Sequence, residues 1–397
     1  MAEIYRGFTY DEDGFRLDVA IKKLLPHFLE DTQFIDMLTD EFKLVSQLRH
    51  PNIAEVYELT EVNGSLLIAM EYVDGKDLRS TFESLLQSGA AYLEFDHIAY
   101  IMARALDGLH HAHIARDFRG ELLQIVHRDF SPSNVLVGYD GAVKLIDFGI
   151  AKARQNRVQT KTGIIKGKVK YMSPEQAFGK RLDCRSDIFS AGSVLYELCT
   201  GKAPFDAKNE IDLIFAVRDA DPTPSREVNP SVPEELDEII RKSMARSRSA
   251  RFQSAMEFRD ALLDFLRAYN SNYSRSRLSR LMKTLWSKEI EHELRQMEEF
   301  VADQSTEDNF GKNLIADVLG PDAAFARFNP NATQHTDLEA PMLTEAEEAQ
   351  ARTILLDSND VRAQEERTTQ IPIDAFDDAL DSHPDFPLAD EKTVRTS

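Results

Sequence analysis

The segment His127-Arg128-Asp129-Phe130-Ser131-Pro132-Ser133-Asn134 carries the clearest structural signal in this chain of 397 residues. Thirteen residues after its last member begins a second short segment, Asp147-Phe148-Gly149. Carboxylate and amide oxygens are ligands that Mg²⁺ prefers, so Asn134 and Asp147 are predicted to hold Mg²⁺ or Mn²⁺. Asp129 would orient and deprotonate a hydroxyl group that attacks a nucleotide phosphate. The two segments together therefore predict a site for phosphoryl transfer.

The residues ahead of these loops predict a small β-rich region. Asp and Gly at 11–14 tolerate the left-handed backbone of a hairpin turn. Apolar residues at helical spacing between Phe34 and Leu48 predict a helix that ends before Pro51. Four strands are expected in this region, at residues 4–10, 17–24, 53–60 and 65–72.

A lysine on the second of these strands is a candidate for binding phosphate. It lies in Val19-Ala20-Ile21-Lys22, and Glu41 follows on the predicted helix. Lys22 would neutralise the α- and β-phosphate charge, and Glu41 would fix its rotamer, because a flexible ammonium needs a partner to be held at one point.

Beyond Leu78 the pattern is mostly helical as far as Ala268, with short apolar strands expected at 124–126, 135–137 and 143–146. The predicted fold class is therefore α+β. An apolar stripe at three- and four-residue steps predicts one amphipathic helix over 274–300, which we expect to pack on the helical region rather than bind a partner or a membrane surface. From residue 303 the chain is too polar to offset its ordering entropy, and disorder is expected.

Charge and cysteine content exclude several classes of protein. The net charge is −21, and Asp and Glu outnumber Lys and Arg by 21 to 7 from residue 301 onward. A phosphate backbone would be repelled, so no nucleic-acid partner is expected. Two cysteines do not make a disulfide framework. With no leader peptide and no apolar run of membrane-spanning length, a cytoplasmic location without a membrane partner is predicted.

Taken together, these segments resemble the Hanks-type protein kinase family over residues 1–268, most closely the myxobacterial type. The resemblance implies a two-lobed kinase fold, with a small lobe and hinge at 1–73 and a large lobe at 74–268, followed by a helical extension at 269–302 and an acidic tail at 303–397. It also implies ATP-dependent phosphorylation of protein serine or threonine in bacterial signal transduction. The small-molecule kinases fit less well, because Ser173-Pro174-Glu175 and the helix around Asp187 belong to protein-substrate architectures.

The resemblance assigns further residues. Glu175 stands in the position of the Ala-Pro-Glu glutamate, and Arg251 fits the buried arginine that pairs with it. Asp187 would support the catalytic loop. The residues expected to contact ATP, in addition to Lys22, Asn134 and Asp147, are Ile4 and Ala20, the gatekeeper Met70, and the hinge residues Glu71 and Val73.

The N-terminus departs from the family pattern. Bacterial members commonly read Gly-x-Gly-Gly-Met-Ala-Glu-Val-Tyr, whereas this chain starts at Met1-Ala2-Glu3-Ile4-Tyr5. The leading glycines let backbone amides approach phosphate, so the chain as written is expected to bind ATP weakly. A start site assigned too far downstream is the favoured interpretation, and a pseudokinase scaffold is the alternative.

A second departure exchanges two side chains. Ser131 stands where the family usually has the catalytic-loop lysine, and Lys168 stands where it usually has threonine. We therefore predict that Lys168 is catalytic and delivers the missing positive charge from the opposite side of the site. The exchange also weakens the inference that the acceptor is serine or threonine.

Regulation is predicted at two places. Arg128, which precedes the catalytic aspartate, calls for an anionic partner, and autophosphorylated Thr160 or Thr162 would provide one. In the tail, Arg352-Thr353 and Arg367-Thr368 each have an apolar residue three positions after the threonine. This pattern resembles phosphothreonine docking sites for forkhead-associated domains. A solubilising or autoinhibitory tail is the alternative.

Overall fold

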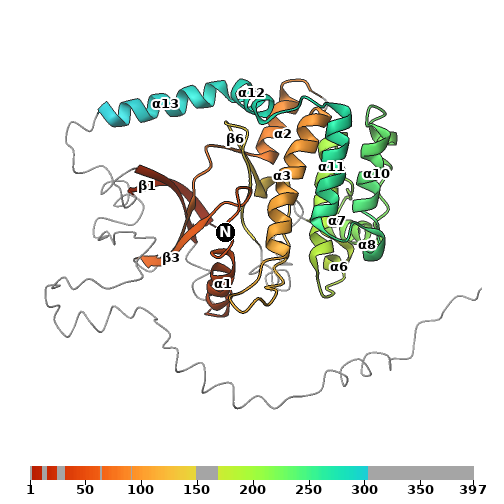
Figure 1. The fold of residues 1–397 in the computed structure, drawn as a ribbon, viewed down its shortest axis with the longest axis horizontal. Helices are drawn as coiled ribbons and strands as arrows, with labels where there is room; N and C mark the ends of the chain where they lie inside the picture. The colour runs from red at the N-terminus through yellow and green to blue at the C-terminus, as the bar shows by residue number, and fades with distance from the viewer. Residues whose placement is uncertain are drawn as a thin grey trace, which may run out of the picture. The chain divides into compact units, whose positions relative to one another are not determined.

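The computed structural model describes residues 2–10, 16–24, 32–62, 65–90, 92–148 and 169–302 (Figure 1). The chain divides into two units, residues 1–332 and 333–397. The second unit lies wholly outside the described residues, as does the predicted tail from 303.

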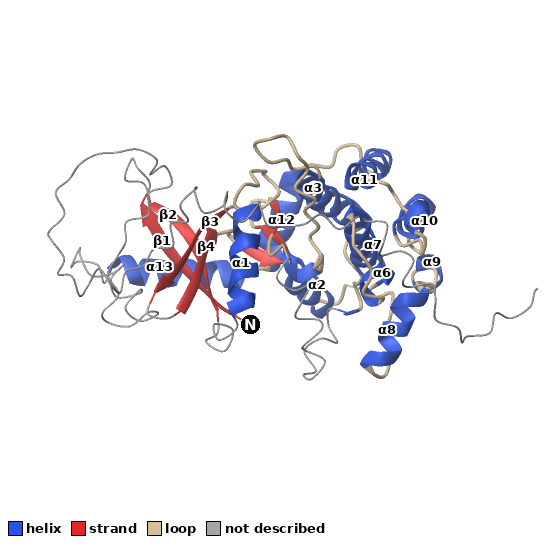
Figure 2. Cartoon of the chain, turned by 90° about the horizontal axis from the view of Figure 1, so that it is seen from below, coloured by secondary structure: helices blue, strands red, loops and turns tan. Residues whose placement is uncertain are grey.

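A four-stranded antiparallel sheet and one helix form the small lobe. The strands are ordered β1-β2-β4-β3, and helix α1 lies beside the sheet (Figure 2). The elements are β1 (Ala2–Tyr10), β2 (Arg16–Leu24), α1 (Thr32–Val45), β3 (Val56–Val62) and β4 (Ser65–Glu71). The predicted hairpin, helix and last strand are confirmed, but the turn at 11–14 is outside the described residues.

The third strand starts at Val56 rather than residue 53, because the residues before it are bonded to the large lobe. The Ala54 amide donates to Leu145 O at 2.9 Å, and the Leu145 amide donates to Asn52 O at 2.9 Å. A backbone engaged in this way cannot also join the small sheet. Residues 52–54 therefore connect the two lobes.

Strand register places the predicted nucleotide-binding residues on neighbouring strands. Ile4 pairs with Lys22 across β1 and β2, while Ala20 pairs with Met70 across β2 and β4. Because successive side chains alternate between faces, Ala20 and Lys22 share one face of the sheet.

The large lobe is built around two buried helices. Most side chains of α3 (Phe95–His113) and α7 (Cys184–Thr200) are buried, as expected for helices that are apolar on nearly all sides. The other helices and turns are α2 (Leu78–Gln87), η2 (Pro132–Asn134), α6 (Pro174–Ala177), α8 (Glu210–Asp219), α9 (Ser225–Val228), α10 (Glu234–Ser243), η3 (Arg248–Ala250) and α11 (Ala255–Tyr269).

A three-stranded sheet, ordered β5-β6-β7, lies between the hinge and the catalytic segments. Its strands are β5 (Gly75–Asp77), β6 (Val135–Gly138) and β7 (Val143–Leu145). The predicted strands at 135–137 and 143–146 are thus present. The prediction of a strand at 124–126 is wrong: Ile125 and Val126 are buried, but Gln124 has a φ of +49°, which interrupts an extended backbone.

The predicted amphipathic helix at 274–300 is two helices. α12 (Arg275–Leu285) and α13 (Ser287–Ala302) meet at Trp286, whose φ of −109° and ψ of 22° leave the helical region. Leu278 and Met282 of α12 are fully buried in the large-lobe core, as predicted. On α13, Leu294 is 55 % exposed, so the apolar stripe is covered only in part.

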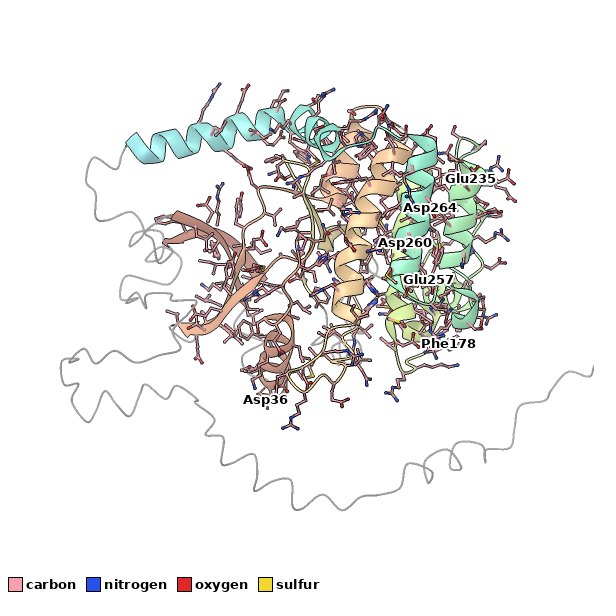
Figure 3. All side chains as sticks on the ribbon, in the orientation of Figure 1. Asp36, Phe178, Glu235, Glu257, Asp260 and Asp264 are labelled. Carbon is pink, nitrogen blue, oxygen red and sulfur yellow. The ribbon has the colours of Figure 1, made fainter. Side chains whose placement is uncertain are left out.

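Acidic side chains are exposed on two helices at the outer face of the large lobe. Glu235 on α10, together with Glu257, Asp260 and Asp264 on α11, points away from the lobe (Figure 3). Negatively charged side chains are therefore not confined to the tail. No helix in the described ranges is both long and apolar enough to span a lipid bilayer.

Candidate active site

The predicted phosphate-binding lysine meets the predicted metal ligand of the second loop. Lys22 Nζ lies 2.6 Å from Asp147 Oδ1, and both side chains are mostly buried. Asp147 has a φ of +57°, an uncommon conformation for a residue other than glycine. Such backbone strain persists only where the surroundings enforce it, and it is concentrated at functional sites.

The catalytic loop holds its own carboxylate in place. Asn134 Nδ2 donates to both the main-chain oxygen and Oδ2 of Asp129, each at 2.8 Å. Asn134 belongs to the short helix η2, where Pro132 occupies the first turn. Since both amide hydrogens bond to Asp129, Asn134 Oδ1 is available as an oxygen ligand. The side chains of Asn134 and Asp147 therefore fit a hard divalent cation such as Mg²⁺.

A buried aspartate on α7 supports this loop. Asp187 accepts from the His127 amide through Oδ2 and from the Arg128 amide through Oδ1, each at 2.8 Å. His113 Nε2 lies 2.8 Å from the same Oδ2. His113 was not predicted from the sequence, because no local pattern links α3 to a residue 74 positions away.

Aromatic packing fixes the second loop against the first. The rings of His127 and Phe148 have centroids 4.6 Å apart, and His127 Nε2 lies 3.2 Å from Ile146 O. Both rings are buried. Both residues therefore pack the loops together.

A cleft between α1, the small sheet and these loops contains the ionic groups. Twelve residues line it: Lys22, Leu38, Phe42, Val45, Ala54, Val56, Ile68, Met70, Leu145, Ile146, Asp147 and Phe148. Its walls are apolar except at Lys22 and Asp147, so an ionic contact there is poorly screened by water.

Five of the predicted ATP-contacting residues lie outside this lining, and one of them is Asn134 of the catalytic loop. The Ile4 side chain is 70 % exposed on β1. Glu71 pairs with Lys144, and its amide donates to Glu55 O at 2.8 Å. Ala20 and Val73 lie on β2 and just after β4. The contacts of these five residues with ATP remain predictions.

The sequence of this chain matches a known protein family. A family model described as the protein kinase domain matches residues 8–262. This chain belongs to the protein kinase family. Proteins of this family use ATP and Mg²⁺, and the predicted fold class and family are thereby confirmed.

Two curated relatives and one solved structure illustrate the similarity. The kinase domain is 40 % identical over 283 residues to the tyrosine-protein kinase MasK of Myxococcus xanthus, covering 71 % of this chain and 44 % of the relative. It is 36 % identical to the serine/threonine-protein kinase PrkC of Bacillus subtilis, covering 60 % and 35 %. The PknI kinase domain of Mycobacterium tuberculosis superposes with a TM-score of 0.50 at 27 % identity, over 66 % of this chain and 91 % of that chain. The chain spans less than half the length of these two curated relatives.

The predicted Glu175–Arg251 pair is present in the kinase domain and is fully satisfied. Arg251 donates to Glu175 at 2.7 and 2.9 Å and to the main-chain oxygens of Ala245, Arg185 and Arg246. Ser186 Oγ adds a 2.7 Å bond to Glu175. Burial alone would raise the pKa of Glu175, but the bonds from Arg251 and Ser186 lower it overall.

Several predicted residues of the kinase domain cannot be placed. Lys168, Thr160 and Thr162 lie outside the described residues, and so does the side chain of Glu41. The Lys22–Glu41 pair therefore stays a prediction. Ser131 is 4 % exposed, and its Oγ has no hydrogen-bond partner within the described part of the chain.

Proposed function

We propose that this chain transfers the γ-phosphoryl group of ATP to serine or threonine hydroxyls of protein substrates in bacterial signalling. The observation that carries the proposal is a pair of contacts: Lys22 on β2 contacts Asp147, and Asn134 contacts Asp129 within the catalytic loop. A scaffold without catalysis would not need this set of charges, so the pseudokinase alternative is disfavoured. Serine and threonine are favoured because most of the curated relatives are named as kinases of these residues.

Each of the site residues has a separate role in the proposed reaction. Lys22 would bind nucleotide phosphate oxygens, with Ile4, Ala20, Met70, Glu71 and Val73 around the base. Bound Mg²⁺, held by Asn134 and Asp147, would neutralise charge on the phosphates. Asp129, oriented by Asn134, takes the proton of the acceptor hydroxyl. The acceptor oxygen bonds to the γ-phosphorus as the bond to the β–γ bridging oxygen breaks, and ADP leaves.

Tyrosine is a second candidate acceptor, for a specific reason. The relative MasK is named a tyrosine-protein kinase, and Ser131 stands where serine/threonine kinases usually have a lysine. The acceptor must therefore be identified directly rather than assumed.

The test uses ATP labelled in the γ-phosphate, Mg²⁺, and a protein acceptor that contains all three hydroxyl residues. After acid hydrolysis, labelled phosphoserine and phosphothreonine are the expected products. Labelled phosphotyrosine alone would favour the second candidate. If the chain transfers no more label than its Asp147→Asn variant, the proposal is wrong.

Lys168 provides a further prediction. If it supplies the positive charge that Ser131 lacks, Lys168→Ala should lower kcat by about 10²-fold, as does loss of other groups that stabilise transition-state charge. Steady-state rates at saturating ATP measure the effect. Lys180→Ala is a suitable control, because Lys180 contacts the ring of Phe178 on the large-lobe surface. Equal rates for both variants would contradict the role.

Activation by autophosphorylation fits the environment of Arg128. This residue has a φ of +64°, and its buried Nε has no hydrogen-bond partner within the described ranges. A phosphate on Thr160 or Thr162 would supply an anionic acceptor for the guanidinium. Autophosphorylation of Thr160 or Thr162 would therefore activate the kinase.

We also propose a class of binding partner and a cellular location. Phosphorylated Thr353 and Thr368 would dock forkhead-associated domains, which read phosphothreonine through basic residues. We place the chain in the cytosol, because its nucleotide substrate is there and its two cysteines are free thiols.

A further inference from the structure

Helices α12 and α13 lie along the outer side of the hinge and make specific contacts there. Ser279 Oγ donates to Tyr139 O at 2.8 Å, and Arg275 Nε donates to Asp140 O at 3.0 Å. Gly141, at a φ of +81°, has no room for a side chain, because a Cβ would lie 2.5 Å from Arg275 O. α12 is therefore fixed against the turn between β6 and β7.

This turn is joined to the exit of the hinge. The Tyr139 amide donates to Asp74 O at 2.8 Å, and Gly75 pairs with Gly138 across β5 and β6. A Cβ on Gly75 would lie 2.2 Å from Val137 O, so the two strands approach too closely for any side chain. Contacts with the β6–β7 turn therefore connect α12 to residues 74–76.

α13 adds a direct side-chain contact to the same strand. Glu293 Oε1 lies 3.0 Å from Lys76 Nζ, and each side chain is less than one third exposed. Lys76 Nζ also lies 5.6 Å from the centroid of the Trp286 ring. Burial alone would lower the pKa of Lys76, yet the hydrogen bond that Lys76 donates to Glu293 raises it overall, so the ammonium is held in its charged form.

A charged residue of the small lobe also contacts this segment. The Arg6 guanidinium lies 4.2 Å from the centroid of the Tyr72 ring in the hinge. Arg6, Asp74, Lys76 and Glu293 all act electrostatically on Tyr72. Arg6 on β1 and Lys76 on β5 are positively charged, whereas Asp74 before β5 and Glu293 on α13 are negatively charged. Lys76 and Glu293, which are 217 positions apart in the sequence, are therefore in contact beside the segment predicted to bind adenine.

We propose that Glu293 is a positioning residue for nucleotide binding: by holding Lys76, it fixes the hinge in the arrangement that receives adenine. The inference rests on the proposed kinase function and extends the nucleotide-binding unit to the helices that follow the kinase domain. It does not involve Asp129 or Asp147, whose contacts lie in other loops. The effect should therefore appear in ATP affinity and not in the chemical step.

The test reverses the two charges separately and together in the full chain. Glu293→Lys and Lys76→Glu each place like charges side by side, and each should raise KM for ATP about fivefold, within the range of partly exposed ion pairs. The Kd of a fluorescent ATP analogue should rise by the same factor, because the changes affect binding. The value of kcat should change less than about twofold, because the contacts of Asp129 and Asp147 lie in other loops. The double variant Lys76→Glu/Glu293→Lys should restore KM and Kd, since the pair is re-formed with opposite polarity.

Glu291→Lys is the matched control, because Glu291 lies on the same helix, pairs only loosely with Arg295 at 3.8 Å and is largely exposed. It should leave KM unchanged. Thermal unfolding of each variant shows whether it is folded. If both single reversals leave KM at the wild-type value, or if the double variant restores nothing, the positioning role is wrong. A wild-type chain that binds no nucleotide would instead overturn the proposed function, and this inference with it.

Discussion

Asp129→Asn should lower kcat for phosphoryl transfer by about 10²- to 10⁴-fold, the usual contribution of a general base. The substitution preserves size and removes the negative charge that accepts the proton. Asn134 Nδ2 donates to Asp129 Oδ2 at 2.8 Å, so the asparagine at position 129 can keep that bond through its oxygen. The loop should therefore remain in place while the chemistry is lost.

Nucleotide affinity separates this effect from general damage. Lys22 and Asp147 remain paired in the variant, so the Kd for an ATP analogue should stay within about twofold of wild type, because ground-state binding is untouched. Single-turnover rates at saturating ATP measure the chemical step directly. A variant that retains more than a tenth of the wild-type rate would show that Asp129 is not the base.

Arg251→Met should destabilise the large lobe by about 3 to 5 kcal/mol, because it leaves the carboxylate of Glu175 buried without its cation. The Arg251 side chain is fully buried and that of Glu175 is 5 % exposed. Five hydrogen bonds from the guanidinium are lost at once. Urea unfolding at pH 7 measures the change in the free energy of unfolding.

Arg248→Met provides the control. Arg248 pairs with Asp183 at 2.7 Å, but both side chains are about one third exposed. Removing such a pair should cost roughly 1 kcal/mol or less. If the two variants are equally stable, burial is not what makes the Glu175–Arg251 pair important. Glu175→Gln, which keeps a neutral acceptor, offers a milder change should Arg251→Met not fold.

The pH dependence of this pair has a defined sign. The folded state lowers the pKa of Glu175, so the pair contributes its full stability above the unfolded pKa of about 4.3. That contribution is lost as the pH falls through the lowered folded value. The stability difference between wild type and Arg251→Met should therefore shrink on acidification from pH 7 to below pH 4, because the carboxyl group in the variant becomes neutral. A difference that stays constant would mean that the charge of Glu175 is unimportant.

Much of the site is predictable from the order of residues alone. The loops around Asp129 and Asp147 and the strand with Lys22 can be recognised from short stretches of sequence, whereas Glu175 and Arg251 are assigned only by the resemblance to the kinase family. Such motifs are readable because neighbouring residues must meet local steric and metal-ligand requirements. The first helix follows from the spacing of its apolar residues. The hairpin follows from Asp and Gly residues that tolerate a left-handed turn.

Other features depend on packing between distant segments. Lys22 meets Asp147 across 125 positions, and His113 reaches Asp187 across 74. Ile125 and Val126 are apolar and buried without forming the predicted strand, and one continuous apolar stripe is divided into two helices at Trp286. Side-chain periodicity reports which face is buried but not what it contacts or where the backbone bends. The contacts of a buried face and the position of a bend depend on packing between segments that are far apart in the sequence. Only the folded chain brings those segments together.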